Sequence, residues 1–327
     1  MSQRLSLIKL ADQLRTEADA YEYLERLRWG DQPVCPHCGS DRKAYFLKPA
    51  NGESRKTRTG SRSQRRVWKC ADCRKQFSVL TGTIFHGTKI EVRKWVLVMF
   101  EMASNRNGMS AREIQRKYDL TAEAAWFMAH RLREAMKREP VAGLLTGRVV
   151  ADETRIGGKP SNRHGHNPKH HHQGEGSHDK AIVMSLISRE TGEVRSRVLP
   201  DVKPGNLRAV LDEHTDPSRT HLHTDTSAQY FWIGKDFAGH DAVNHTQREY
   251  ARGDVSTNQA ENFFSQLKRS IDGTHHHVSV DHLPRYLAEF SFRYTYRKEN
   301  DTQRMARLVR RVAGRRLMYR EPAPGWS

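Results

Sequence analysis

The sequence predicts a mixed α+β protein in which a small cysteine-bearing ribbon and a helical region precede a mixed sheet flanked by helices. Three observations lead to this prediction. Paired cysteines stand early in the chain, helical periodicity follows them, and the alternation of apolar and polar residues typical of strands comes next. We expect five parts: an N-terminal helical segment (1–30), the ribbon (31–90), a helical region (91–139), a sheet domain (148–299) and a basic C-terminal tail (300–327).

The composition favours a polyanionic partner. Lys and Arg number 56 and Asp and Glu number 38 among the 327 residues, which gives a formal net charge of +18. A surplus of this size favours nucleic acid over a small neutral substrate. No apolar run approaches the roughly 18 residues that a membrane span requires, and no signal-peptide pattern follows Met1. We therefore expect a cytoplasmic protein that associates with the nucleoid when it is bound to DNA.

The four cysteines form two Cys-x-x-Cys pairs and leave no thiol over. In a reducing compartment such pairs predict one structural zinc ion in tetrahedral coordination rather than disulfides. Tight turns hold the two thiolates of each pair together, and Pro36 and Gly39 supply the turn chemistry at the first pair. The predicted zinc ligands are Cys35, Cys38, Cys70 and Cys73.

A basic run extends from Arg55 to Lys75, and Asp72 is its sole acidic residue. On a zinc ribbon, with Trp68 interleaved, such a run predicts contact with the phosphate backbone of DNA. A solvated surface would have the same composition, so this alternative stays open. The candidate DNA-binding residues of the run are Arg58, Arg62, Arg65, Arg66, Lys69, Arg74 and Lys75.

The region after the ribbon predicts three helices, over Val92–Ala103, Ser110–Tyr118 and Thr121–Lys137. The link between the last two is short enough for a helix-turn-helix. Arg131 and Arg133 would lie on the second helix of this motif and are candidate DNA-binding residues. A generic helical bundle has the same signals and remains the alternative.

Residues 148–299 alternate between strands and helices in an order that suits a mixed sheet flanked by helices. A Gly-, Asn- and His-rich insertion, residues 157–179, is interpreted as a basic loop near the candidate active site. The predicted strands are Arg148–Ile156, Lys180–Ser188, Glu193–Leu199, Thr220–Asp225 and Asp241–Asn244. The predicted helices are Pro204–Leu211, Ala228–Ile233, Ser256–Asp272 and Asp281–Arg297.

Three carboxylates in this region have a spacing that suits a two-metal site. Asp152 follows an apolar run, Asp225 ends a predicted strand, and Glu261 follows after 35 intervening residues. Glu261 lies in the first two turns of the helix predicted to begin at Ser256, whose polar stripe also carries Lys268. Carboxylates that end two strands and lie on one helix can converge on two divalent metal ions for in-line attack at a phosphodiester. Each acid on its own is also consistent with a solvated surface group.

The chain resembles the bacterial insertion-sequence DDE transposases that join an N-terminal zinc ribbon to a catalytic domain, the ISXO-like transposase family. The resemblance rests on the phrases CPHCGS, WKCADCRKQFSVLTGTIF, VVADETRIGGK, HTDTSAQY and STNQAENFFSQLKRSIDGTHHHVS with HLPRYLAEFSFRY, which cover most of the chain in that order. It implies a ribonuclease-H-like catalytic domain in which Asp152, Asp225 and Glu261 bind the catalytic metal. It also implies that Lys268 contacts DNA or a phosphate.

Two residues compete with this assignment. Asn258 lies three residues before Glu261 on the same helix face and remains a rival, because family members vary in which residue is taken as the third ligand. Glu153 directly follows Asp152, but strand alternation sends its side chain to the opposite side of the strand.

The turn after the acidic helix carries three consecutive histidines. His276 and His277 lie just beyond Lys268, close enough to help position a phosphate. A solvated turn explains them equally well. His275 stands where relatives in this family have an aromatic residue, which leaves the role of the turn open.

The resemblance also implies a reaction and its partners. A metal-activated water would cleave the transposon end to free a 3′ hydroxyl, which would then attack a target strand. Two Mg²⁺ or Mn²⁺ ions are expected at the carboxylates, beside the structural zinc of the ribbon. The expected partner is double-stranded DNA, as terminal inverted repeats and as target, and the joining of two ends implies a homodimer or larger assembly. The alternative function is a non-catalytic, transposase-derived regulator that binds DNA.

Overall fold

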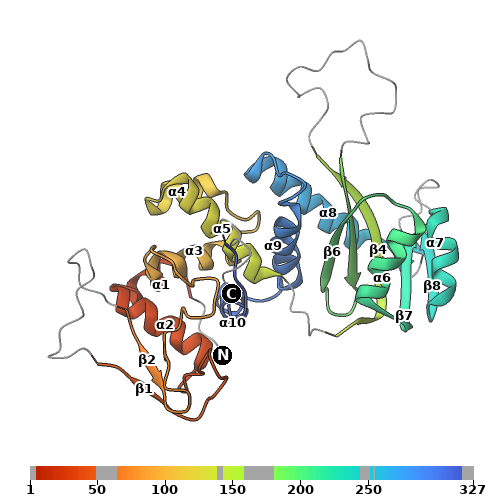
Figure 1. Cartoon of the computed structure of the whole chain (residues 1–327). Coiled ribbons are helices and arrows are strands. Elements are labelled where there is room, and N and C mark those ends of the chain that lie inside the picture. The colour runs from red at the N-terminus through yellow and green to blue at the C-terminus, as the bar shows by residue number, and fades with distance from the viewer. Residues whose placement is uncertain are drawn as a thin grey trace, which may run out of the picture. The chain divides into compact units, whose positions relative to one another are not determined.

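The computed structural model describes residues 5–48, 65–137, 143–157, 180–243, 251–252 and 255–318 (Figure 1). The chain divides into two compact units. The first unit contains Met1–Asn105, Met109–Met136 and Glu299–Ser327, and the second contains Arg106–Gly108 and Lys137–Lys298. Residues 158–179 of the predicted basic loop and the predicted DNA contacts Arg58 and Arg62 lie outside the described residues.

The first unit begins with two helices, α1 (Leu7–Gln13) and α2 (Glu17–Trp29), where the sequence predicted one helical segment. A capping box restarts the helix at Thr16. The Thr16 hydroxyl accepts a hydrogen bond from the Asp19 backbone N–H at 3.2 Å, and the Asp19 carboxylate accepts one from the Thr16 N–H at 2.7 Å. These bonds satisfy two N–H groups that have no partner within α2, so a second helix start is favoured here.

The ribbon is a three-stranded antiparallel sheet of β1 (Ala44–Phe46), β2 (Trp68–Cys70) and β3 (Gln76–Phe77) in that order. Its small core consists of buried Cys35, Cys70 and Phe77, against which the rings of Trp29 and Trp68 pack. A core of this size is too small to fold such a segment by apolar burial alone, so a metal cross-link suits the ribbon.

The three helices predicted after the ribbon are confirmed, and each end lies within one residue of its prediction. They are α3 (Val92–Ser104), α4 (Ala111–Tyr118) and α5 (Ala122–Met136). The Ser110 side chain caps α4 by accepting a hydrogen bond from the Glu113 N–H at 3.1 Å. Asp119 ends α4 in the left-handed conformation, with φ of 48°, which turns the chain into α5.

The predicted basic C-terminal tail is corrected by the structure. Residues 301–310 form a helix, α10 (Asp301–Arg310), that buries Met305, Leu308 and Val309 in the first unit. The Tyr23 hydroxyl of α2 lies 3.8 Å from the Met305 sulfur. Farther on, Arg315 donates a hydrogen bond to the backbone oxygen of Glu134 at 2.6 Å. The chain end up to residue 318 is therefore part of a folded unit, because its apolar stripe completes the core around α2 and α3.

The second unit is built on a five-stranded mixed sheet in the order β6-β5-β4-β7-β8, which confirms the predicted fold class. The pairs β4–β5 and β5–β6 are antiparallel, and β4–β7 and β7–β8 are parallel. The strands are β4 (Leu145–Ile156), β5 (Ala181–Ser188), β6 (Val194–Leu199), β7 (Thr215–Asp225) and β8 (Gly239–Val243). A separate hairpin pairs β9 (Ala251–Arg252) with β10 (Val255–Ser256).

Helices cover both faces of this sheet (Figure 1). One core joins Val149 and Ala151 of β4 to α6 (Pro204–His214) and α7 (Ala228–Ile233). The other joins Val150 of β4 to α8 (Asn258–Ser270) and α9 (Leu283–Thr295). Since successive side chains of a strand point to opposite faces, this division fixes which face each later residue of β4 takes. Among the described residues, no helix has the length and apolar character needed to span a membrane.

Candidate active site and zinc-binding ribbon

Asp152 and Asp225 lie on adjacent parallel strands of the sheet. The parallel register of β4 and β7 pairs Val150 with His223, and each aspartate lies two residues beyond this pair. Both aspartates therefore share the face of Val150, which α8 covers. Asp225 is the last residue of β7, as predicted, but β4 continues past Asp152 to residue 156 because β5 keeps pairing with it. The predicted end of this strand at Ile156 is confirmed, and Asp152 therefore lies within its strand whereas Asp225 ends its own.

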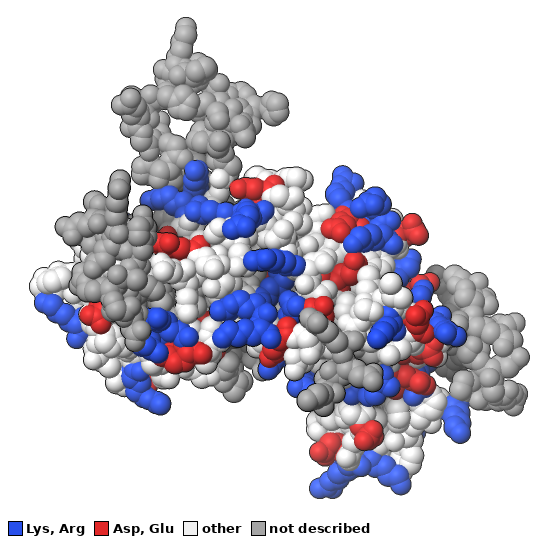
Figure 2. Space-filling model, turned by 180° about the vertical axis from the view of Figure 1, so that it is seen from behind, with Lys and Arg blue, Asp and Glu red and all other residues white. Residues whose placement is uncertain are grey.

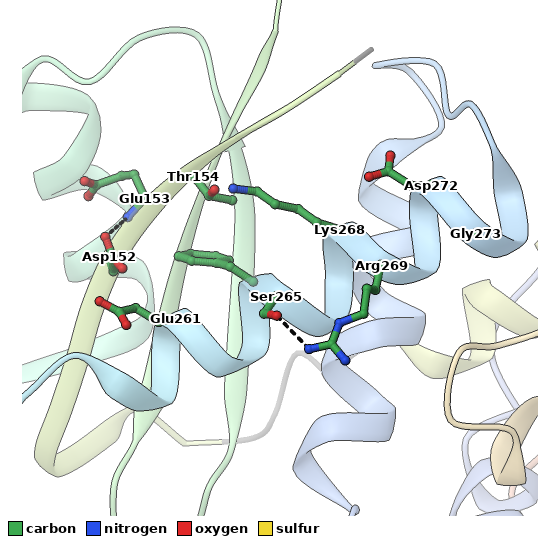
Figure 3. A pocket seen from close by; sticks show the side chains of 10 residues that line it. Asp152, Glu153, Thr154, Glu261, Ser265, Lys268, Arg269, Asp272 and Gly273 are labelled. Atoms are coloured by element: carbon green, nitrogen blue, oxygen red, sulfur yellow. Dashed lines mark hydrogen bonds between the residues drawn. The ribbon is translucent and has the colours of Figure 1, made fainter. Parts of the chain in front are cut away.

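A pocket of 870 Å³ lies between β4 and α8, within the ~300–1,000 Å³ typical of ligand sites. In Figure 3 the side chains of Asp152 and Glu261 lie at one end of this pocket, and Lys268 reaches toward Thr154. The residues that line it from β4 are Asp152, Glu153 and Thr154. Those from α8 are Glu261, Phe264, Ser265, Lys268 and Arg269, followed by Asp272 and Gly273 of the π-helix η7 (Ile271–His275).

Glu261, and not Asn258, lies at the pocket. Asn258 is the first residue of α8 and is exposed, and it is not among the lining residues, whereas Glu261 in the next turn is. The helix start predicted at Ser256 is corrected, because Ser256 belongs to β10 and Thr257 is the N-cap without a side-chain capping bond. The side chain that α8 presents toward Asp152 is thus the charged one of the two rivals.

The three carboxylates do not form a closed cluster. Among the described residues, the ligand groups that lie within 4.8 Å of one another are the four cysteines and one group on β7 and β8. Asp225 is also not among the residues that line the pocket. The structure brings Asp152 and Glu261 to one pocket and sets Asp225 beside Asp152 through the sheet register. Like charges at short range repel, so closer approach of all three requires a compensating cation.

Glu153 points to the opposite side of the sheet from Asp152, as strand alternation predicts. Its carboxylate accepts a hydrogen bond from the hydroxyl of Tyr230, which is buried in the core beneath α6 and α7. Burial raises the pKa of Glu153 to about 8, and the negative charges of Asp152 and Asp225 contribute to the same shift. Glu153 is therefore anchored away from the carboxylate pair, although it borders the same pocket.

Lys268 lies at the pocket, and the histidines grouped with it do not. Lys268 is exposed and lines the pocket two turns after Glu261. His276 and His277 are exposed and are not among the lining residues. The π-helix carries the chain away after Gly273, and the ring of His275 packs 4.9 Å from an aromatic ring of α9. The suggestion that His276 and His277 position a phosphate gains no support from this geometry.

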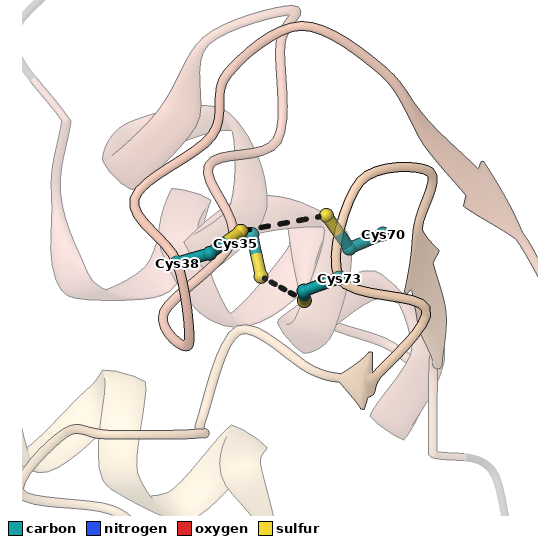
Figure 4. Close-up of side chains that lie close together, drawn as sticks. All are labelled: Cys35, Cys38, Cys70 and Cys73. Atoms are coloured by element: carbon teal, nitrogen blue, oxygen red, sulfur yellow. Dashed lines mark hydrogen bonds between the residues drawn. The ribbon is translucent and has the colours of Figure 1, made fainter.

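The four cysteines lie together in the ribbon (Figure 4). The sulfur atoms of Cys35 and Cys73 are 3.6 Å apart, and those of Cys38 and Cys70 are 3.7 Å apart. With Zn–S bonds of about 2.3 Å, tetrahedral ligands lie about 3.8 Å apart, so these separations fit one zinc ion. Hydrogen bonding from the Cys73 backbone N–H lowers the pKa of Cys70 to about 7, whereas desolvation and hydrogen bonds with the other three thiols raise the pKa of Cys38 to about 12. The geometry of the sulfur atoms, and not their pKa, therefore supports the zinc site.

Some residues of the predicted DNA-contacting run make contacts within the protein instead. Arg66 donates to the carboxylate of Glu25 at 2.9 Å and to that of Glu22 at 2.6 Å. The indole N–H of Trp68 also donates to Glu25 at 2.9 Å. These contacts link the ribbon to α2. Glu25 is 7% exposed, so its bonds to Arg66 and Trp68 are largely shielded from water. Arg66 and Trp68 are therefore structural, and the interleaved aromatic residue does not indicate nucleic-acid binding.

The other basic candidates divide by exposure. Arg74 and Lys75 are exposed on the ribbon, whereas Lys69 is half-buried. Arg65 is exposed, with its guanidinium 3.4 Å from the Ser78 hydroxyl. Figure 2 shows Lys and Arg side chains spread over one face of the molecule with acidic side chains among them. Among the described candidates of the basic run, Arg74 and Lys75 are the best placed for phosphate contact.

The two arginines predicted to contact DNA from the helix-turn-helix are less accessible than expected. Arg133 is 1% exposed, so the structure corrects its assignment to a DNA surface. Arg131 is half-buried, and its guanidinium lies 4.6 Å from the ring centre of Phe127, one turn earlier on α5. The core-facing stripe of α5 includes position 133, which periodicity of apolar residues alone does not show.

Sequence reasoning missed Arg269 and Tyr230 as parts of the site. Arg269 lines the pocket and donates to the Ser265 hydroxyl at 2.9 Å. Tyr230 holds Glu153 from the opposite face of the sheet. The two adjacent basic residues Lys268 and Arg269 could have indicated from the sequence that Arg269 belongs to the site. No local pattern connects Tyr230 with Glu153, because the packing of α7 on the sheet brings them together.

Comparison with known proteins identifies the family. Residues 144–295 match the family model described as the ISXO2-like transposase domain, and residues 15–76 match that of the transposase zinc-ribbon domain. A protein of Halobacterium salinarum described as an uncharacterized protein in transposable element ISH50 is 26% identical over 285 residues, which cover 85% of this chain and 90% of that protein. The resemblance inferred from the sequence is confirmed: the chain carries an ISXO2-like transposase domain, preceded by a transposase zinc-ribbon domain.

Proposed function

We propose that this transposase binds the ends of its element and catalyses DNA strand cleavage and strand transfer at Asp152, Asp225 and Glu261. The observation that carries the proposal is the shared pocket of Asp152 and Glu261, with Asp225 beside Asp152 in the sheet. One strand and one helix thus present acids to one pocket, and the adjacent strand carries a third acid on the same face of the sheet. Phosphodiester chemistry at such a place needs a cation, since the acids would otherwise repel the DNA.

The residues present fit divalent Mg²⁺ or Mn²⁺. Their donors are carboxylate oxygens, which these ions prefer. The charges of Asp152 and Asp225 act on the pKa of Glu153, so the negative charge is concentrated where a cation would offset it. When bound, the ions would activate the attacking oxygen and stabilise the leaving oxygen. Asp152, Asp225 and Glu261 would hold them.

The chain's own cations supply a phosphate-binding edge to the same pocket. Lys268 and Arg269 line it on α8, and Arg269 is steadied by its hydrogen bond to Ser265. A cationic side chain two turns from Glu261 can bind a backbone phosphate and so orient the scissile bond. Asp272, at the other end of the pocket from Asp152 and Glu261 (Figure 3), is an acid that would repel a phosphate there.

DNA binding would involve both units. The surplus of 18 positive charges favours DNA over other partners, and the exposed Arg74 and Lys75 offer phosphate contacts on the ribbon. Joining two ends of one element requires two active sites, so we propose that a homodimer or larger assembly forms on DNA.

Incubation of purified protein with Mg²⁺ and a duplex that ends in the element's own terminal repeat tests the proposal. We expect a nick that frees a 3′ hydroxyl, followed by joining of that end to a second duplex. Asp152→Asn and Asp225→Asn should bind the duplex but not cleave it. Specific binding without cleavage by the unsubstituted protein would instead support a non-catalytic regulator.

A further inference from the structure

A second group of ligand-type side chains lies on the outer strands of the sheet. His221 and His223 of β7 and Asp241 of β8 each bring a ligand atom within 4.8 Å of the other two. The His221 Nε2 atom lies 2.7 Å from a carboxylate oxygen of Asp241, and the two imidazole rings are 5.3 Å apart. No part of the zinc ribbon or of the pocket between β4 and α8 contributes to this group.

The strand register builds this group. His221 and His223 are two residues apart on β7 and so share one face of the sheet. The parallel partner of His223 on β8 is Asp241, and the partner of His221 is Gly239. A Cβ atom at Gly239 would come within 2.8 Å of the His221 ring. Glycine at this position therefore gives the His221 ring the space it occupies over β8, from which it reaches Asp241.

His223 provides an independent sign that the group is incomplete without a ligand. Its side chain is 2% exposed, and within the described part of the chain its Nδ1 atom makes no hydrogen bond. A buried ring nitrogen without a partner costs free energy, which is why such atoms are rare in folded proteins. A metal ion coordinated by the buried imidazole at this group would offset that cost.

We propose that His221, His223 and Asp241 form a binding site for a divalent transition-metal ion of the zinc class. Two imidazoles and one carboxylate are a ligand set that zinc and its neighbours accept. With metal–ligand bonds of about 2.0–2.2 Å, tetrahedral donors lie about 3.4 Å apart, which small side-chain rotations can reach from the present separations. The side chains of His221 and Asp241 are 44% and 51% exposed, so water can take the fourth position.

The surroundings set the expected strength and effect of the site. Arg148 and Arg189 lie close enough to act on the charge of His223, although Glu190 engages Arg148 at 3.0 Å. These cations weaken metal binding, so the site binds zinc less tightly than the four thiolates of the ribbon. A bound ion would tie β8 to β7 two residues before Asp225 and so stiffen the strand that carries it.

Zinc stoichiometry tests the site without any reference to activity. The parent protein for the test carries Asp152→Asn and Glu261→Gln, so that the carboxylate pocket does not contribute. After equilibrium dialysis against micromolar Zn²⁺, we expect two zinc ions per chain in this parent. Adding His221→Ala or Asp241→Asn, both at exposed positions, should lower the count to one. His240→Asn is the matched control on β8: this histidine bonds Thr224 at 2.9 Å outside the group, so its replacement should leave two.

Cobalt substitution separates this site from the ribbon. In Co²⁺-loaded protein the thiolate charge-transfer absorption reports the four cysteines, and it should stay unchanged in Asp241→Asn. One zinc ion in the parent, or two ions in both His221→Ala and Asp241→Asn, would overturn the proposal. Loss of the thiolate band in Asp241→Asn would also overturn it, because the lost ion would then have come from the ribbon. Since the parent lacks two of the proposed catalytic acids, none of these results depends on the transposase reaction.

Discussion

Asp152 in the middle of β4 and Glu261 in the first turns of α8 line the same pocket, from the sheet and from the helix that covers it. Strand alternation turns Asp152 to the face on which α8 packs, and the apolar stripe of α8 leaves Glu261 at the edge of that contact. Asp225 joins them through a register set by two parallel strands. The candidate site thus depends on the sheet order rather than on any local motif.

The ribbon should contain one zinc ion that the four thiols release together. We expect one equivalent of zinc to be liberated when an organomercurial titrates the thiols of protein purified without chelator. Because the ribbon core is small, metal affinity there is folding free energy, of the order of 10–16 kcal/mol in zinc-finger peptides. Tryptophan fluorescence should shift to the red as Trp29 and Trp68, 6.4 Å apart beside the site, become solvated. Release of less than half an equivalent would count against the site.

Salt dependence should separate DNA-contacting from structural arginines on the ribbon. Each phosphate contact adds about −0.9 to the slope of log K against log salt concentration. Arg74→Ala and Lys75→Ala should each reduce the magnitude of this slope by about that amount. Arg66→Ala is the matched control, because Arg66 is held by Glu22 and Glu25: it should lower the melting temperature and leave the slope unchanged. Equal slopes for all three variants would show that the exposed pair is merely solvated.

The C-terminal helix α10 should behave as core. Leu308 is fully buried, so Leu308→Ala should destabilise the first unit by about 2–5 kcal/mol in chemical denaturation. Arg310 is exposed on the same helix, and Arg310→Ala should change stability by less than about 0.5 kcal/mol. A dispensable basic tail would instead tolerate both substitutions.

Glu153 should make stability depend on pH. Its pKa is raised from 4.5 to about 8, so the folded state keeps a proton that the unfolded state loses. The associated stability is present below about pH 4.5 and is lost as the pH rises through about 8. Glu153→Gln does not lose this stability. The difference in melting temperature between the variant and the unsubstituted protein should therefore increase in favour of the variant as the pH rises from about 4.5 to about 8.

The measurement belongs in magnesium-free buffer, because bound cations would offset the charges of Asp152 and Asp225 and lower the pKa of Glu153. Adding Mg²⁺ should therefore reduce the pH-dependent difference in melting temperature between the variant and the unsubstituted protein. The same variant should keep nearly all cleavage activity, since Glu153 faces Tyr230 rather than Glu261. A melting-temperature difference that is constant from pH 5 to 8 would refute the assigned shift.

Local patterns predicted the helices, the strands and the polar stripe of α8, because periodicity and caps determine those features directly. The basic character of residues 300–327 hid the buried stripe of Met305, Leu308 and Val309, whose spacing is that of a helix face. The capping box of Asn300 and Gln303 was the overlooked signal for that helix.

Long-range pairs could not be predicted in this way. Arg66 and Trp68 looked like a nucleic-acid surface because nothing in their own segment indicates Glu25 as a partner. The same holds for Arg133, whose burial depends on how α5 packs. The juxtaposition of Asp152 with Asp225 required the parallel pairing of β4 and β7, which the family resemblance implied and local pattern did not.

The most direct test of the proposed site compares Glu261→Gln with Asn258→Ala in Mg²⁺-dependent cleavage of a duplex ending in the terminal repeat. Both variants should fold and bind this duplex as the unsubstituted protein does. Losing a metal ligand removes several kcal/mol of barrier lowering, so Glu261→Gln should lose cleavage by orders of magnitude, while Asn258→Ala should retain measurable activity. Near-normal cleavage by Glu261→Gln beside an inactive Asn258→Ala would contradict the assignment and transfer the third role to Asn258.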